Sequence, residues 1–133
     1  MEMQGAYLVC RERWKVGERD RELALQLMFL TWMHWADPPF VTGLRGDPDA
    51  LDLWRETFGW LGAEASSDAE FLAVSGVMIT VTPWAFGDAT EWQAKAAFLT
   101  SRVQELLPSG MSESTFEGRG EYGRYFAHQF RPR

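Results

Sequence analysis

The stretch GERDRELALQLMFLTWMHWADPP, residues 17–39, carries more apolar surface than one face of a helix can hold. Acidic residues precede its apolar run, where the positive end of a helix dipole favours negative charge: Glu18, Asp20 and Glu22. Pro38 and Pro39 stop the run. A helix of about 17 residues that is apolar nearly all round is normally buried in a core or in a subunit contact. We therefore predict that residues 20–36 form the central helix of the protein.

Signals for helix N-termini recur further along the chain. Asp47 is placed to accept hydrogen bonds from free N–H groups of a first turn, and Pro48 suits the first helical position. Two capping boxes follow, in which a side chain at the helix start and another three residues later each satisfy a free N–H group. They are Ser67 with Glu70, and Asp88 with Glu91. These signals predict three more helices, the second of which Pro83 should kink or divide.

Two segments favour a different fold class. The run VMITVT, residues 77–82, is β-branched and alternating, which is typical of a strand. The stretch AYLVCRERW, residues 6–14, is predicted to be a short first helix but is also compatible with a strand. We favour helix over 77–82 because the capping box before it is specific and no second clear strand is available for pairing. The prediction is a single all-α domain spanning residues 1–133, a bundle of five or six helices; the alternative is α+β with a small sheet.

Length, charge and cysteine content restrict the class of protein. A chain of 133 residues is one domain by size, and 46% hydrophobic residues supply a core. We expect no signal peptide, because no charged-then-apolar N-terminal segment with a small-residue cleavage site is present. We expect no membrane span, because the apolar runs are shorter than a span requires. Cys10 has no partner for an internal disulfide, which favours a reducing cytoplasm and a buried, inert thiol. The net charge of −6 disfavours nucleic-acid binding, because attraction to phosphate dominates that affinity.

Metal and catalytic motifs are not evident. His34 and His128 are the two histidines, and neither has metal-ligand spacing around it. An acidic row lies at helical spacing: Asp49, Asp52 and Glu56. It is compatible with a solvated helix face or, together with Asp88 or Glu91, with Mg²⁺ held with a substrate phosphate. We predict no metal and no cofactor, and the sequence identifies no catalytic residue.

The segment FEGRGEYGRYF, residues 116–126, predicts a turn followed by a packing element. Gly118 and Gly120 supply the turn. A short C-terminal helix from Glu121 then places aromatic side chains four residues apart on one face: Tyr122, Phe126 and Phe130. Gly123 should weaken this helix by up to about 1 kcal/mol relative to alanine. We expect the aromatic face to pack on the bundle and hold the helix in place.

The same segment also contains the groups of an anion site. Arg119 lies between glycines at a helix start, where free N–H groups bind phosphate or carboxylate. Arg124 and His128 follow four residues apart, on a different face from the aromatic residues. A small anionic ligand is therefore a possible partner of this end of the chain.

Aromatic content leads to two functional hypotheses. Seven Trp and an aromatic fraction of 14% exceed what a small bundle can easily enclose, which is typical of an interface or an apolar cavity. The first hypothesis is a non-catalytic interaction protein that self-associates, and it predicts a homodimer. The second is a small-molecule binding protein or hydrolase, with the loop of residues 36–48 at the rim of its pocket. The predicted ligand-binding residues are Trp32, His34, Trp35, Phe40, Arg119, Arg124 and His128.

Overall fold

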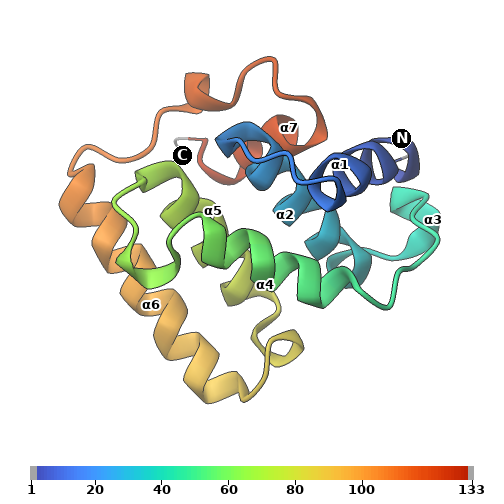
Figure 1. Ribbon diagram of the computed structural model, residues 1–133. Coiled ribbons are helices and arrows are strands. Elements are labelled where there is room, and N and C mark those ends of the chain that lie inside the picture. Colours follow the sequence, from blue (N-terminus) through green and yellow to red (C-terminus); the bar gives the residue numbers. More distant parts are fainter. Residues whose placement is uncertain (1–2, 132–133) are drawn as a thin grey trace.

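A computed structural model describes residues 3–131, which form an all-helical domain without a strand (Figure 1). Its α-helices are α1 (Gln4–Lys15), α2 (Arg21–Ala36), α3 (Pro39–Thr42), α4 (Ala50–Trp60), α5 (Ala69–Val81), α6 (Ala89–Leu106) and α7 (Gly120–Gln129). Single 3₁₀ turns occupy Ala63–Ala65, Pro83–Ala85 and Glu113–Phe116. The predicted all-α class is confirmed, and the alternative with a small sheet is wrong. The additional helix is α3, one turn inside the segment that we expected to be a loop.

Helix α2 is the centre of the core. Every residue from Leu23 to Met33 except Gln26 is buried. Neighbours on different sides of α2 explain why it is apolar nearly all round: α1, α4, α5 and α7 all contact it. The start of the helix is fixed by Asp20, whose carboxylate accepts a hydrogen bond of 2.8 Å from the Leu23 N–H. The prediction of a central helix over residues 20–36 is confirmed.

One of the two predicted capping boxes is displaced. Asp88 caps α6 as expected and accepts from the Glu91 N–H at 2.9 Å. For α5, the cap is Asp68 rather than Ser67, and it accepts from the Phe71 N–H at 3.2 Å. Arg21 donates to the Asp68 carboxylate at 2.6 Å and helps to hold it at the helix end. The carboxylate of Glu70 instead forms ion pairs with Arg21 of α2 and with Arg119, which precedes α7.

The β-branched run at residues 77–82 is helical as far as Val81. Much of α5 is buried between α2 and α6, so tertiary packing overrides the weak local preference for a strand. Thr82 leaves the helix, and Pro83 begins the following 3₁₀ turn. The proline therefore divides the segment, as predicted.

Asp47 ties the first helix to the loop before α4. Helix α4 begins at Ala50, two residues later than Pro48 suggested, and Asp47 Oδ1 accepts from the Asp49 N–H at 2.9 Å. Its other oxygen accepts from the Tyr7 hydroxyl at 2.6 Å and from the Arg11 guanidinium at 2.8 Å. Burial alone would raise the pKa of Asp47, but these hydrogen bonds outweigh burial and lower the pKa to about 2.

Because folding lowers the pKa of Asp47, the free energy of unfolding depends on pH. Asp47 normally titrates near 3.8, so its contribution is complete above about pH 4 and is lost as the pH falls through about 2. We expect Asp47→Asn to cost about 1–2 kcal/mol of unfolding free energy at pH 7 and much less at pH 2.5. Urea unfolding at pH 7, 4 and 2.5 measures this. Asp52→Asn, at an exposed carboxylate, is the control, and an equal loss at every pH in Asp47→Asn would contradict the assignment.

The C-terminal helix packs through its aromatic face, as predicted. Gly118 and Gly120 both have positive φ, at 68° and 67°, and turn the chain into α7. Tyr122 and Phe126 are fully buried, and their rings lie 5.9 and 5.7 Å from the ring of Phe29 in α2. Helix α7 thus covers one side of the central helix (Figure 1).

Candidate binding groove

A groove lies where α2, α3 and α7 meet. Its volume is about 390 Å³, within the range of pockets that hold small molecules or side chains of a partner. It is lined by Met3, Phe29, Met33, Asp37, Val41, Glu121, Arg124, Tyr125 and His128. We call these nine residues the α3 groove.

Helical spacing explains how the α3 groove is assembled. From α2 and its C-terminal end come Phe29, Met33 and Asp37, which are four residues apart and so form one stripe. The four residues from α7 also lie on one stripe, between Glu121 and His128. At the α3 end the groove is bounded by Met3, which is held there because its N–H donates to the Thr42 carbonyl at 2.7 Å.

The floor of the α3 groove is apolar and its rim is charged. Glu121 and Arg124 form an ion pair within α7. Asp37 makes no ion pair within residues 3–131. Burial, together with the negative charge of Asp37, raises the pKa of the neighbouring Tyr125. The groove therefore combines apolar walls with the two carboxylates of Asp37 and Glu121 and the guanidinium of Arg124.

The predicted site tryptophans and His34 serve the core. Trp32 is fully buried, and its Nε1 donates to the Thr82 hydroxyl at 3.0 Å. Trp35 is half-buried and donates to the same hydroxyl at 3.1 Å. His34 Nδ1 donates to the Leu30 carbonyl at 2.9 Å, and its ring lies 4.5 Å from that of Tyr7. None of these three side chains lines the α3 groove.

Arg119 is held by carboxylates of two other helices. Its guanidinium lies 2.6 Å from Glu22 and 2.8 Å from Glu70, and it also donates to the Thr115 carbonyl at 3.1 Å. With Arg124 it lines a smaller hollow of about 260 Å³ at the start of α7. The donors of Arg119 are thus used within the fold. Arg124 and His128 both line the α3 groove.

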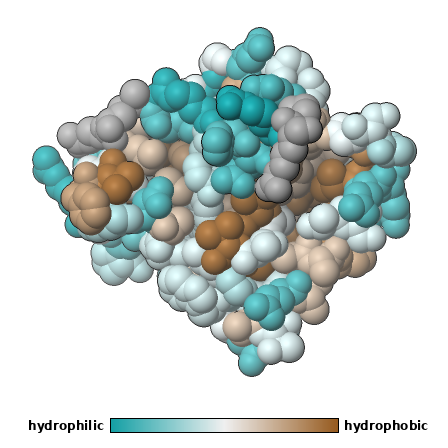
Figure 2. All heavy atoms as spheres, turned by 180° about the vertical axis from the view of Figure 1, so that it is seen from behind, coloured by the Kyte–Doolittle hydropathy of each residue, from teal (hydrophilic) through white to brown (hydrophobic). Residues whose placement is uncertain are grey.

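Phe40 lies at the exposed end of α3, where 88% of its surface is accessible to solvent. Its neighbour Val41 is 47% exposed and lines the α3 groove. In the space-filling view, hydrophobic atoms stand among hydrophilic ones at the edge of the molecule where α3 lies (Figure 2). The exposed aromatic ring therefore belongs to the residue next to one that lines the apolar hollow.

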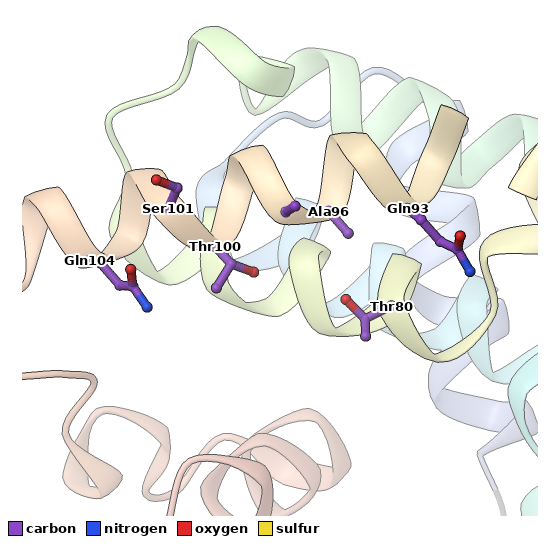
Figure 3. A pocket seen from close by; sticks show the side chains of 7 residues that line it. Thr80, Gln93, Ala96, Thr100, Ser101 and Gln104 are labelled. Atoms are coloured by element: carbon purple, nitrogen blue, oxygen red, sulfur yellow. The ribbon is translucent and has the colours of Figure 1, made fainter. Parts of the chain in front are cut away.

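A second groove runs along α6. This helix lies at the opposite edge of the molecule from α3 (Figure 1). Its volume is about 450 Å³, and its lining is uncharged: Thr80, Gln93, Ala96, Ala97, Thr100, Ser101 and Gln104. Figure 3 shows that these side chains come from α6 except Thr80, which comes from α5. Small and amide side chains at helical spacing are typical of a solvated helix face, so we regard this groove as the weaker candidate.

Neither a metal cluster nor a membrane span is present in the described part of the chain. Residues 3–131 contain no group of three or more His, Cys, Asp or Glu side chains placed to hold a metal ion. The acidic row of Asp49, Asp52 and Glu56 is not such a group. Within the same residues, no helix has the length and apolarity needed to cross a bilayer.

Sequence reasoning found part of the α3 groove. Arg124 and His128 were recognised as two residues on one helix face, and the structure brings them together. Met33, Asp37 and Tyr125 were missed, since no local signal shows that α2 and α7 lie next to each other. A helical wheel of α7 offers the one usable hint, because the aromatic and charged stripes meet at Tyr125.

The fold and the groove define a small all-α protein with one amphipathic surface groove beside an exposed aromatic side chain. No family model, no curated protein and no solved structure matches the chain.

Proposed function

We propose that this chain is a non-catalytic interaction protein that forms a homodimer through α3 and the α3 groove. The observation that carries the proposal is the 88% exposure of Phe40 beside an apolar hollow. A large apolar side chain so fully exposed gains from burial, at about 1.5–3 kcal/mol for a ring that leaves water completely. An exposed ring and a hollow next to each other on one surface are the two halves of a contact.

Two-fold symmetry supports a second copy of the chain as the partner. In a two-fold dimer the same patch is used on both subunits, so that a residue on one copy meets a different residue on the other, and the reverse. Phe40 of each copy can enter the α3 groove of the other, and both rings are then buried at once. The contact needs no catalytic group, in keeping with a groove that contains an ion pair but no activated nucleophile.

We place this activity in a reducing cytoplasm. Cys10 is half-buried, and burial raises the pKa of its thiol, which keeps it protonated and unreactive. A chain with one such thiol gains nothing from an oxidising compartment.

Phe40→Ser is the direct test of the homodimer. Because two rings leave water when the dimer forms, we expect this change to raise the dimer Kd at least about 100-fold. Light scattering and sedimentation over a concentration series measure the Kd. The matched control is Phe98→Ser, at a ring that is 50% exposed on α6 and far from α3. A wild-type protein that stays monomeric at millimolar concentration, or equal losses in both variants, would contradict the proposal.

A small-molecule binding protein is the second candidate, favoured by the placement of Arg124 and His128 in one groove of about 390 Å³. An apolar carboxylate or phosphate could rest on the groove floor with its anion toward these two side chains. The two candidates differ in solution. A monomer whose melting temperature rises with such ligands, and whose shift is lost in Arg124→Ala, would favour the second.

A further inference from the structure

We infer that the groove of one copy recognises the α3 end of the other through an ion pair between Asp37 and Arg45, in addition to the Phe40 ring. This inference rests on the proposed homodimer and states its charge chemistry. It comes from two charged side chains that the fold leaves without an ion pair within residues 3–131, one in the groove and one beyond α3.

Asp37 supplies the carboxylate of this ion pair, and it lies in the groove. Asp37 ends α2, lines the groove and is half-buried, yet it makes no ion pair within the described residues. The neighbouring Glu121 is already paired with Arg124 on the same helix. A half-buried carboxylate loses part of its hydration, so a cation that reaches it gains more than at an open surface. The groove thus favours an apolar group accompanied by a positive charge.

Arg45 supplies that charge five residues after Phe40 in the chain. It lies three residues after α3, its side chain is exposed, and its guanidinium contacts no carboxylate within residues 3–131. Its backbone is fixed, because the Arg45 N–H donates to the Gln4 side-chain oxygen at 3.1 Å. An exposed aromatic ring and an arginine on one short segment are the chemical complement of an apolar groove with a carboxylate at its rim.

Two-fold symmetry brings the charges together. Asp37 and Arg45 lie four residues before and four residues after Val41 in the chain. A two-fold axis that passes near Val41 relates the two sides of this segment, so that Asp37 of each copy can meet Arg45 of the other. The dimer then contains two equivalent ion pairs, one on each side of the aromatic contact.

Charge reversal in separate copies tests the pairing. In a homodimer of Asp37→Arg, two cations meet at the place of each ion pair, and in a homodimer of Arg45→Asp, two anions meet there. Each variant alone should therefore repel itself. We expect each to raise the homodimer Kd at least tenfold relative to the wild type. An equimolar mixture of the two variants should form a heterodimer with a Kd within about threefold of the wild type, since one ion pair is the original Asp37–Arg45 pair and the other is restored with reversed polarity. Sedimentation and native mass spectrometry measure the three species.

The outcomes separate this inference from the homodimer itself. Asp52→Arg, at an exposed carboxylate on α4, is the control and should leave the Kd unchanged. If the wild type dimerises and Phe40→Ser disrupts the dimer, but the mixture shows no preference for the heterodimer, the ion pair is overturned and the proposed function stands. If the wild type is monomeric, both are overturned. Circular dichroism of each variant shows that it is folded.

Discussion

Replacing Gly123 with alanine is expected to destabilise the protein by at least about 3 kcal/mol. A Cβ at this position would lie 2.2 Å from the Phe116 carbonyl oxygen and 3.0 Å from the Arg119 Cβ. The first of these atoms belongs to the backbone and cannot rotate away. Relief requires α7 to move away from the 3₁₀ turn Glu113–Phe116, and that would separate the packed aromatic rings of the two elements.

Those rings show why the shift is costly. Phe116 is 2% exposed, and its ring lies within 6.1 Å of the ring of Phe126 and stacks at 5.7 Å on Phe130. A displacement of α7 opens this cluster at several contacts at once, and tightly packed interiors give little relief.

A glycine in a different helix provides the matched control. Gly59 lies in α4, and an added Cβ there would have no neighbour within 4 Å. Gly59→Ala should therefore stabilise the protein by about 0.5–1 kcal/mol, the ordinary gain in helix propensity. Urea unfolding of both variants measures the difference, which should have opposite signs. A gain in Gly123→Ala similar to that in Gly59→Ala would show that the close approach to Phe116 is absent.

Gly123 also shows where sequence reasoning about this fold ends. From the sequence it is a defect in a short helix, one that alanine should repair. In the structure it permits the backbones of α7 and the preceding 3₁₀ turn to come close together, so the expected sign is reversed. Helix propensity is a local property, and it carries no information on which backbone will pack against a given residue.

The start of a helix is predictable from the sequence where the capping side chain interacts only with residues close to it in the chain. Asp88 caps α6 as the sequence indicates, because nothing else in the described chain binds its side chain. At the start of α5 the same reasoning chose Ser67 and Glu70, and a distant residue changed the outcome. Arg21, from α2, binds Asp68 and Glu70 together, so the cap moves by one residue and Glu70 becomes an interior group.

The aromatic excess inferred from composition is smaller in the structure. The tryptophans at 32 and 54 are fully buried, and the core takes up most of the aromatic rings of α2 and α7. What stays outside is a short set of large hydrophobic rings with at least 45% exposure: Phe40, Trp60, Trp84 and Phe98. Composition could not show which rings these are, since the exposure of Phe40 depends on how the turn of α3 is placed beside α2.

The buried carboxylate of Glu70 joins three helices. It lies in α5 with 8% of its side chain exposed, and it accepts a short hydrogen bond from the Tyr122 hydroxyl of α7. Arg119, which precedes α7, lies 2.8 Å from it, and Arg21 of α2 lies 3.1 Å from it. Burial and the charge of Glu70 raise the pKa of Tyr122, which keeps its hydroxyl proton in place for this bond.

Glu70→Ala is expected to cost about 3–5 kcal/mol, because it leaves two guanidinium groups and a buried hydroxyl without their shared acceptor. Arg21 and Arg119 keep their second partners, Asp68 and Glu22, but both of those carboxylates are more exposed. The loss should therefore appear as a weakened attachment of α7 as well as a lower unfolding free energy. Urea unfolding and hydrogen exchange of the α7 amides measure the two effects.

Glu64→Ala is the control that shows what the loss of an ordinary surface carboxylate costs, for comparison with the buried Glu70. Glu64 is 40% exposed and lies 3.4 Å from the Lys95 ammonium, so its removal should cost less than about 1 kcal/mol. Adding 0.5 M sodium chloride should remove most of the Glu64 effect and little of the Glu70 effect, since salt screens exposed pairs more than buried ones. If both variants lose the same small free energy and respond equally to salt, Glu70 behaves as a surface group, and α7 is held to the core by its aromatic face alone.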